Sequence, residues 1–212
     1  KDAGELEDKC HNIFKSVDPV LGEYFGVMRK ENLLDLDNRK GKAPGGYCTE
    51  YPFQRLPFIF MNAVGTHSDV QTMIHEGGHA FHVFESAELP FFSQRDVGME
   101  FAEVASMAME LLASPYLTVD NGGFYTDKES SRARIEHLEK VIMFWPYMAV
   151  VDAFQHWAYT NPDKALNPDN CDSEWSDLWK RFQMSEHIDY SDCGDIISTC
   201  LLYTSPSPRD PR

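Results

Sequence analysis

The chain has 212 residues and a formal net charge of −15, from 19 basic and 34 acidic side chains. This length allows a hydrophobic core, and 13% aromatic residues argue against a disordered chain. An acidic protein repels phosphate backbones and anionic lipids, so we expect neither nucleic-acid nor membrane partners. Five scattered cysteines without a Cys-x-x-Cys pair are typical of free thiols in a reducing compartment, so the sequence predicts a cytoplasmic protein.

The first predicted elements are one helix and two short strands. Asp18 is a good N-cap, and Pro19 after it favours the first position of an amphipathic helix. Residues 37–46 are polar and rich in glycine, which predicts a loop. Residues 47–51 and 56–62 are rich in aromatic and apolar side chains and are predicted as strands.

The rest of the chain is predicted to be helical. Capping boxes at Ser68-x-x-Gln71 and Thr126-x-x-Glu129 mark two helix starts, and Asp96 marks a third. The predicted helices cover 69–84, 96–113 and 126–159, with a last one that begins at Asp172 or Ser173 after a proline-punctuated loop over 161–170. The fold class expected from this pattern is mainly α with a short β-strand pair.

A His-Glu-x-x-His motif runs from His75 to His79 inside the first of these helices. Histidines four residues apart lie on one helix face, ~6 Å apart along the axis, so both imidazoles can reach one zinc ion. Glu76 lies close enough to act as general base on a water molecule at the metal. The alternative is a polar helix face whose histidines contact solvent or carboxylates.

A zinc site of this type needs a third protein ligand. His82 shares the face but lies ~10 Å beyond His75, too far for all three histidines to bind one ion. It is therefore beside the site, facing substrate, or at the core edge. The next predicted helix offers Glu100, Glu103 and Glu110 on one face among apolar residues, and spacing alone leaves these three open. Mid-helix Gly77 and Gly78 indicate a close approach of another backbone or a ligand.

These motifs resemble the thimet oligopeptidase/oligoendopeptidase F family of zinc metallopeptidases. The resemblance rests on His-Glu-Gly-Gly-His-Ala-Phe-His at 75–82 and Phe-Ala-Glu-Val-Ala-Ser-Met-Ala-Met-Glu at 101–110, and Gly-Lys-Ala-Pro-Gly-Gly-Tyr-Cys at 41–48 resembles the oligoendopeptidase branch. It implies that Glu103 is the third ligand of a single Zn²⁺ ion, with His75 and His79. Glu110, two turns on, would then support a ligand.

The resemblance also implies a fold and a substrate class. The family has a zincin-type catalytic domain in a two-lobed helical body around a deep channel, which admits short unstructured peptides. The expected activity is that of a zinc endopeptidase with Glu76 as base. By resemblance Phe58, Ile59, Phe60 and Met61 would pair with the substrate backbone, although an ordinary core role fits them equally.

The C-terminal residues from Cys200 resemble a translated sequencing adapter. We therefore expect 1–199 to be a partial catalytic domain of a zinc oligopeptidase and 200–212 to be a non-native tail. The family's histidine and tyrosines that stabilise the reaction intermediate would lie beyond the native part. The alternative to an active peptidase is thus a catalytically incomplete fragment that binds zinc and peptide.

Overall fold

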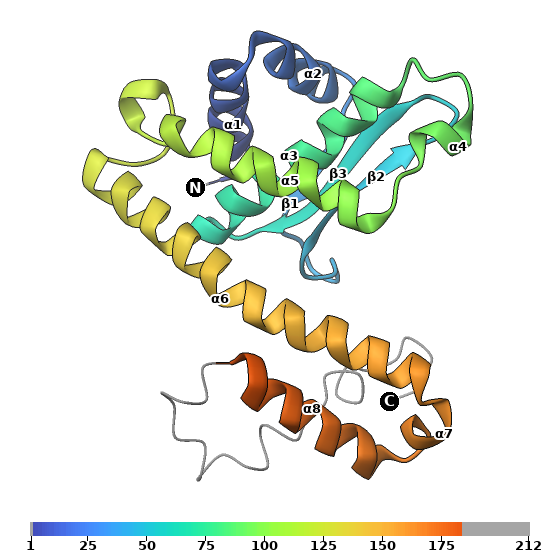
Figure 1. The fold of residues 1–212 in the computed structure, drawn as a ribbon. Helices are drawn as coiled ribbons and strands as arrows, with labels where there is room; N and C mark the ends of the chain where they lie inside the picture. The colour runs from blue at the N-terminus through green and yellow to red at the C-terminus, as the bar shows by residue number, and fades with distance from the viewer. Residues whose placement is uncertain (1, 184–212) are drawn as a thin grey trace. The chain divides into compact units, whose positions relative to one another are not determined.

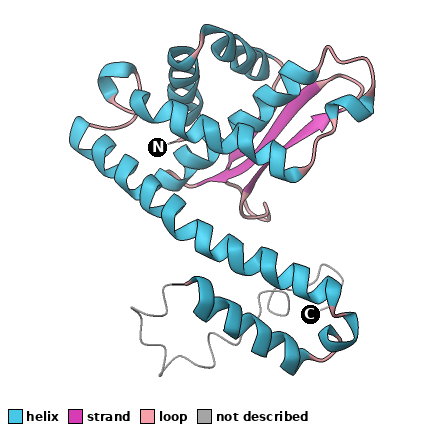
Figure 2. Ribbon diagram, viewed as in Figure 1, coloured by secondary structure: helices cyan, strands magenta, loops and turns pink. Residues whose placement is uncertain are grey.

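The computed structural model describes residues 2–183, apart from the side chains of Met99 and Glu100, so the expected tail over 200–212 lies outside the described residues. The chain divides into two compact units, Lys1–Arg134 and Ile135–Arg212. Helices dominate and three strands form one sheet, which confirms the predicted class (Figures 1 and 2). None of the described helices has the length and hydropathy that crossing a membrane requires.

The first unit opens with two helices, α1 (Ala3–Val17) and α2 (Pro19–Lys30). Asp18 ends α1 and caps α2, because its carboxylate accepts a hydrogen bond of 2.8 Å from the Val20 N–H. The start predicted from Asp18-Pro19 is therefore confirmed.

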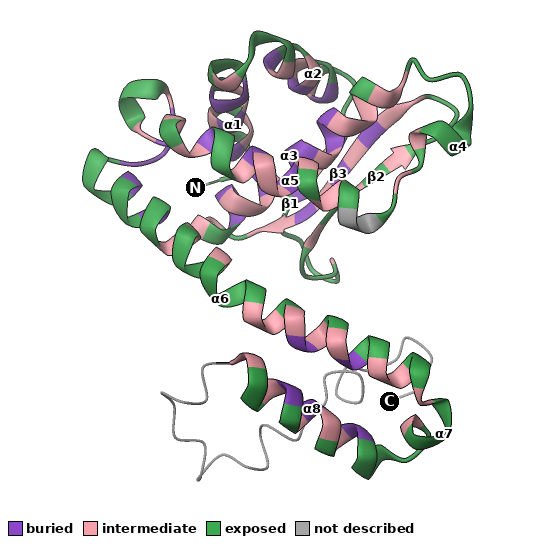
Figure 3. Cartoon of the chain, in the orientation of Figure 1, coloured by how far each residue is buried: buried purple, intermediate pink, exposed green. Residues whose placement is uncertain are grey.

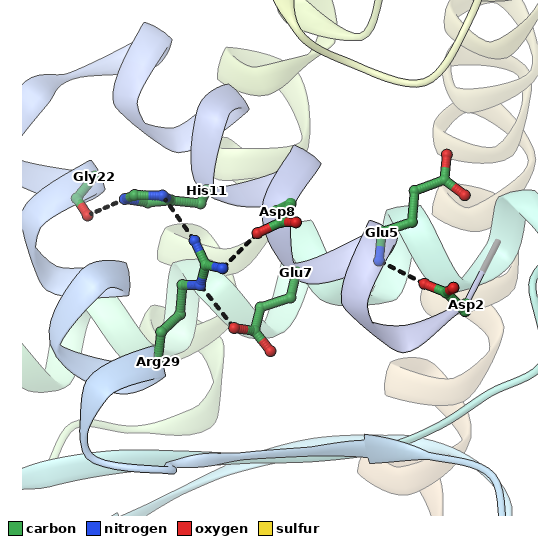
Figure 4. A network of polar contacts seen from close by, with 7 residues as sticks. All are labelled: Asp2, Glu5, Glu7, Asp8, His11, Gly22 and Arg29. Carbon is green, nitrogen blue, oxygen red and sulfur yellow. Dashed lines mark hydrogen bonds and ion pairs between the residues drawn. The ribbon is translucent and has the colours of Figure 1, made fainter.

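Polar contacts join these two helices (Figure 4). Arg29 of α2 donates from Nε to Glu7 at 2.6 Å, and also contacts Asp8 and the Nδ1 atom of His11 on α1. The Nε2 atom of His11 in turn lies 3.0 Å from the carbonyl oxygen of Gly22. These contacts fix the α1–α2 pair, whose inner face contributes to the core of this unit (Figure 3).

The sheet contains β1 (Leu34–Asp37), β2 (Gly46–Tyr51) and β3 (Leu56–Ala63) in the order β1-β3-β2. β3 pairs parallel with β1 and antiparallel with β2. The sequence predicted only β2 and β3. β1 was missed because its four residues, Leu-Asp-Leu-Asp, are too short and too acidic to stand out as a strand.

This topology corrects the expected role of residues 58–61. They belong to the central strand, whose backbone is already paired with β2 and, at Ile59 and Phe60, with β1, so they cannot pair with a substrate backbone. Ile59 and Met61 are 0% and 2% exposed and belong to the core, whereas Phe58 and Phe60 face the other side of the sheet. β1 and β2 are the two edge strands.

Buried Lys42 anchors the glycine-rich loop that leads into β2. Its side chain is 1% exposed, and Nζ donates to the Asp35 carboxylate and carbonyl, each at 3.0 Å, and to the Asp37 carbonyl at 2.7 Å. The ammonium also lies 4.7 Å from the centre of the Phe60 ring. The loop is thereby tied to β1 and β3 just before the edge strand begins.

The predicted motif helix is α3 (His67–Ser86), and it begins two residues earlier than expected. Its capping box uses Thr66 and Asp69 instead of Ser68 and Gln71. The Asp69 carboxylate accepts from the Thr66 N–H and hydroxyl and from the Val64 N–H, which anchors the turn before the helix.

The helix predicted over 96–113 begins three residues later than expected. A short helix, α4 (Phe92–Arg95), ends at Asp96, and α5 (Met99–Ala113) follows, so Asp96 closes one helix and does not open the other. After two short 3₁₀ turns the chain enters α6 (Asp127–Thr160). The Glu129 carboxylate accepts from the Thr126 N–H and hydroxyl at 2.9 and 2.8 Å, so this capping box is confirmed.

The second unit packs the later part of α6 against α8 (Pro168–Phe182), with α7 (Pro162–Ala165) between them in sequence. The loop predicted over 161–170 therefore contains α7 and the start of α8. Pro162 and Pro168 each occupy the first turn of a helix, where a missing N–H costs nothing. Among the described residues of this unit, those that are buried are Val150, Phe154, Cys171, Trp175 and Leu178.

Candidate active site

Helices α3 and α5 bring His75, His79 and Glu103 together. One carboxylate oxygen of Glu103 lies 3.2 Å from Nε2 of His75, and the other lies 3.7 Å from Nε2 of His79. One ligand atom from each residue lies within 4.8 Å of the other two. Donors of a tetrahedral zinc ion are ~3.3 Å apart when the bonds are ~2 Å long, so this donor set fits a zinc ion.

Glycine at position 78 explains how the two helices approach so closely. A Cβ atom on Gly78 would lie 2.6 Å from Cα of Ser106 and 2.7 Å from the carbonyl oxygen of Ala105, both backbone atoms of α5. A Cβ atom on Gly77 would lie 2.5 Å from the ring of Phe14 on α1. The close approach of another backbone, expected from the two mid-helix glycines, is thus present at Gly78, whereas Gly77 makes room for a side-chain ring.

Glu110 of α5 fixes the orientation of His75. The Nδ1 atom of His75 lies 2.6 Å from a carboxylate oxygen of Glu110, and because a carboxylate only accepts, Nδ1–H donates; Nε2 is thereby turned toward Glu103. This hydrogen bond is also the main reason that the pKa of His75 is raised above its ordinary value. The arrangement is the one typical of a histidine that is held ready to bind a metal ion.

His79 and Glu76 have pKa values shifted by burial. Desolvation lowers the pKa of His79, which keeps its imidazole neutral and able to coordinate. Glu76 is 7% exposed, and desolvation raises the pKa of its carboxyl group toward the range of a general base. The backbone N–H of Cys48 on β2 opposes this shift by interacting with the Glu76 carboxylate.

A cavity of about 400 Å³ opens beside these side chains. His75, Glu76, His79 and Glu103 line it together with His82, which lies outside the group of ligand atoms, as the helix spacing predicted. Of the other glutamates that spacing left open, Glu110 contacts His75 and lines a second cavity of about 300 Å³, and the Glu100 side chain is not among those described.

The edge strand β2 forms one wall of the larger cavity through Gly46, Cys48 and Glu50. The Ile59 N–H donates to the Leu33 carbonyl on the β1 side, so Ile59 and its partner Cys48 form a non-hydrogen-bonded pair. The backbone N–H and C=O of these three β2 residues consequently point away from β3, toward the free edge. Of these groups, the Cys48 N–H contacts the Glu76 carboxylate, and the others have no strand partner among the described residues. A row of backbone donors and acceptors therefore runs beside His75, His79 and Glu103.

Sequence reasoning missed this edge and two side chains beside it. Cys48 has a half-buried thiol whose pKa desolvation raises to about 12, so it stays protonated. Arg95 of α4 donates to Glu50 at 2.7 Å and lines the same cavity. The alternation of β2, with residues 46, 48 and 50 facing inward, could have indicated the wall, but nothing local linked Arg95 to it.

Curated proteins are similar to about half of this chain. Among curated relatives, an oligoendopeptidase F homologue of Borreliella burgdorferi is 29% identical over 117 residues, which are 53% of this chain and 20% of that protein. Oligopeptidase PepF of Bacillus subtilis is 31% identical over 124 residues, 55% of this chain and 18% of that protein. The chain thus spans about a fifth of the length of these relatives.

Solved structures match nearly the whole chain. Pz peptidase A, determined with an inhibitor, is 30% identical with a TM-score of 0.78, covering 93% of this chain and 34% of that one. A Bacillus anthracis structure described as an oligoendopeptidase F is 31% identical with a TM-score of 0.77, covering 94% and 34%. The family model named Peptidase family M3 matches residues 16–197. The chain therefore belongs to peptidase family M3, which confirms the family resemblance of its motifs.

Proposed function

We propose that the protein containing this chain is a zinc-dependent endopeptidase that hydrolyses short, unstructured peptides in the cytoplasm. The observation that carries the proposal is the convergence of His75, His79 and Glu103 beside a buried Glu76, in a cavity walled by a free strand edge. One zinc ion would be held by these two imidazoles and one carboxylate, which is the donor set of an open catalytic site. Membership of peptidase family M3 supports the same activity.

The chemistry divides between the metal and Glu76. A zinc ion in this site supplies Lewis acidity, which lowers the pKa of water and polarises a carbonyl group. Glu76 takes the proton of the attacking water and passes it to the leaving amine, and its burial raises its pKa in the direction that this role requires. Glu110 holds the Nδ1–H of His75 and so keeps Nε2 directed at the metal position.

The substrate backbone is proposed to lie along β2. Apart from the Cys48 N–H, which contacts the Glu76 carboxylate, the backbone N–H and C=O groups of Gly46, Cys48 and Glu50 lie at the free edge, so an extended peptide can add to the sheet as a further strand. This recognition uses the main chain, which suits peptides of varied sequence. His82, on the same cavity wall, is placed to contact side chains of the bound peptide.

A second candidate function is a zinc- and peptide-binding fragment without catalysis. The chain spans about a fifth of its curated relatives, so groups that stabilise the developing oxyanion can lie outside it. Losing one such donor slows a reaction by about 10²–10³. This candidate predicts zinc and peptide binding without peptide cleavage.

Zinc content is the first test. The purified chain is dialysed and its zinc is measured by elemental analysis, beside Glu103→Ala and a control, Glu23→Ala, which removes an exposed carboxylate of α2. We expect close to one zinc per chain in the parent and the control, and a large loss in Glu103→Ala. A folded parent without zinc would contradict the proposed metal site.

Cleavage of quenched fluorescent peptides then separates the two candidates. Glu76→Gln should abolish any cleavage and retain zinc, because it removes the base and leaves the three ligands in place. If zinc is lost instead, Glu76 does not act as the base. If the zinc-loaded parent binds peptides and cleaves none, the second candidate is the correct one.

A further inference from the structure

Arg95 is a buried cation at the wall of the proposed peptide cleft. Its side chain is only 7% exposed and lines the same cavity as His75 and Glu76. Nη1 donates to a carboxylate oxygen of Glu50 at 2.7 Å and makes a longer contact of 3.4 Å with the carbonyl oxygen of Pro52. The guanidinium thus bridges the last free-edge residue of β2 and the turn that follows it.

Among the described residues, most of the donors of Arg95 have no hydrogen-bond partner. A guanidinium carries five N–H groups, and both recorded hydrogen bonds use Nη1. Nε is buried without a partner among the residues that the structure describes. The charge of Arg95 is paired with Glu50, but a buried donor without an acceptor is costly, so the unpaired Nε–H beside a cleft points to a ligand that supplies the missing acceptor.

The position of Arg95 also limits the cleft. From Gly46 to Glu50 the free edge of β2 extends ~14 Å, at about 3.4 Å per residue, which accommodates an extended segment of about five residues. Arg95 contacts the strand at Glu50 and the chain at Pro52, directly after this stretch. A peptide laid along the edge therefore has one of its ends close to the guanidinium.

We propose that Arg95 is a specificity-determining residue that binds an acceptor oxygen at the end of a peptide docked along β2. The proposal rests on the peptide-binding function proposed above. Nη1 already donates to Glu50, so the N–H groups of Arg95 that remain for a ligand are all donors. They bind an acceptor oxygen of a peptide and do not bind a free ammonium group, which is also a donor. The oxygen comes from an N-terminal acyl carbonyl if the peptide runs antiparallel to β2, and from the C-terminal carboxylate if it runs parallel.

Calorimetric titration of four pentapeptides tests this assignment. Each is an alanine peptide with a central phenylalanine, and the four combine a free or acetylated N-terminus with a C-terminal acid or amide. The protein is the zinc-loaded 212-residue chain with Glu76→Gln, which prevents turnover, alone or combined with Arg95→Met. The matched control is Arg39→Met, which also removes one positive charge, from an exposed arginine of the loop after β1 that pairs with Asp35.

In the parent we expect one end group, acetyl or carboxylate, to improve affinity about tenfold, as a hydrogen bond to a charged donor does. Arg95→Met should abolish that advantage while changing the affinity of the peptides without the group by less than about twofold. Arg39→Met should retain the advantage. Loss of the acetyl advantage identifies the antiparallel arrangement, and loss of the carboxylate advantage identifies the parallel one.

Other outcomes overturn the inference. If Arg95→Met weakens all four peptides equally, Arg95 only supports the wall, and if it changes none, Arg95 contacts no peptide. If the zinc-loaded parent binds no peptide at all, the proposed peptide-binding function fails as well, so the two failures are distinct. If Arg95→Met loses its helical circular dichroism, the same titrations are made with Arg95→Lys. Lysine can still pair with Glu50 but lacks the planar donors, so it tests the peptide contact in a chain that keeps the ion pair.

Discussion

Two helix pairs in this chain pack in opposite ways. α3 and α5 meet through small residues, with Gly78 against the backbone of Ser106. α6 and α8 meet through large aromatic rings, with Phe154 edge-on to Trp175 at 5.4 Å between ring centres. The first contact brings helix backbones together, and the second fills the space between them with side chains.

The two kinds of packing place different side chains at the contact between the helices. Because the backbones of α3 and α5 approach closely, polar side chains of the two helices come within a short distance of one another, and Glu103 of α5 reaches both histidines of α3. The aromatic contact buries apolar area and brings no comparable ligand group together within the described residues of the second unit. Packing by small residues thus brings the polar side chains of the candidate site together, and packing by large residues stabilises the fold.

Removing the aromatic contact should have the largest effect on stability. Phe154→Ala leaves a cavity in the second unit and should cost about 3–5 kcal/mol. All four tryptophans lie at position 145 or later, so tryptophan fluorescence during urea unfolding reports on this unit alone. Zinc content should be unchanged, and Tyr159→Ala, which removes an exposed ring from the same helix, is the control. Loss of zinc in Phe154→Ala would show that the aromatic contact also supports the candidate metal site.

Adding one methyl group at the small-residue contact should damage both stability and the site. Gly78→Ala places a Cβ atom against backbone atoms that cannot move independently, and should cost about 3 kcal/mol and weaken zinc binding. The measurements are urea unfolding by circular dichroism and zinc content. Gly4→Ala is the control, because its Cβ atom would meet its nearest neighbour at 3.6 Å. Parent-like behaviour of Gly78→Ala would show that α3 and α5 do not need this approach.

Glu110→Gln tests whether the contact also orients a ligand. The amide cannot replace the charged acceptor of the His75 Nδ1–H, so zinc affinity should fall about 10–100-fold with little change in fold. Competition with a fluorescent chelator measures this affinity. Glu139→Gln, an exposed position on α6, should bind zinc like the parent. Equal affinity in both variants would remove Glu110 from the site.

The smallest expected effect is a pH dependence of the zinc-free chain. Glu110 raises the pKa of His75 above its unfolded value, so the folded state binds the proton more tightly. This contribution to stability is complete below the unfolded pKa of about 6.5 and is lost as pH rises through the folded pKa. In urea unfolding the parent should therefore exceed Glu110→Gln by more at pH 5.5 than at pH 8.5. A difference that grows with pH contradicts this sign.

The sequence predicted best what depends on local spacing. His75, Glu76 and His79 follow from helix periodicity alone, and the Thr126 capping box from a three-residue pattern. Glu103 depends on how two helices cross, so spacing left three glutamates open until the family resemblance selected one. The structure brings Glu103 together with the two histidines, as expected.

The features that the sequence did not predict depend on tertiary contacts. The family resemblance implied that the aromatic stretch of β3 pairs with substrate, but its place in the sheet is set by β1, a strand too short to detect. Arg95 and Glu50 are 45 residues apart, and no periodicity connects them. Pro162 and Pro168 suggested a loop because proline either ends or begins a helix, and only the structure distinguishes these two uses.

The free edge of β2 has a consequence for self-association. Unpaired strand edges recruit strands of other molecules, and long, flat edges are a common origin of aggregation. This edge is six residues long and has a buried, charged arginine at one end. So short an edge forms few hydrogen bonds with the strand of another folded copy. The length of the edge therefore limits strand pairing between copies of this chain.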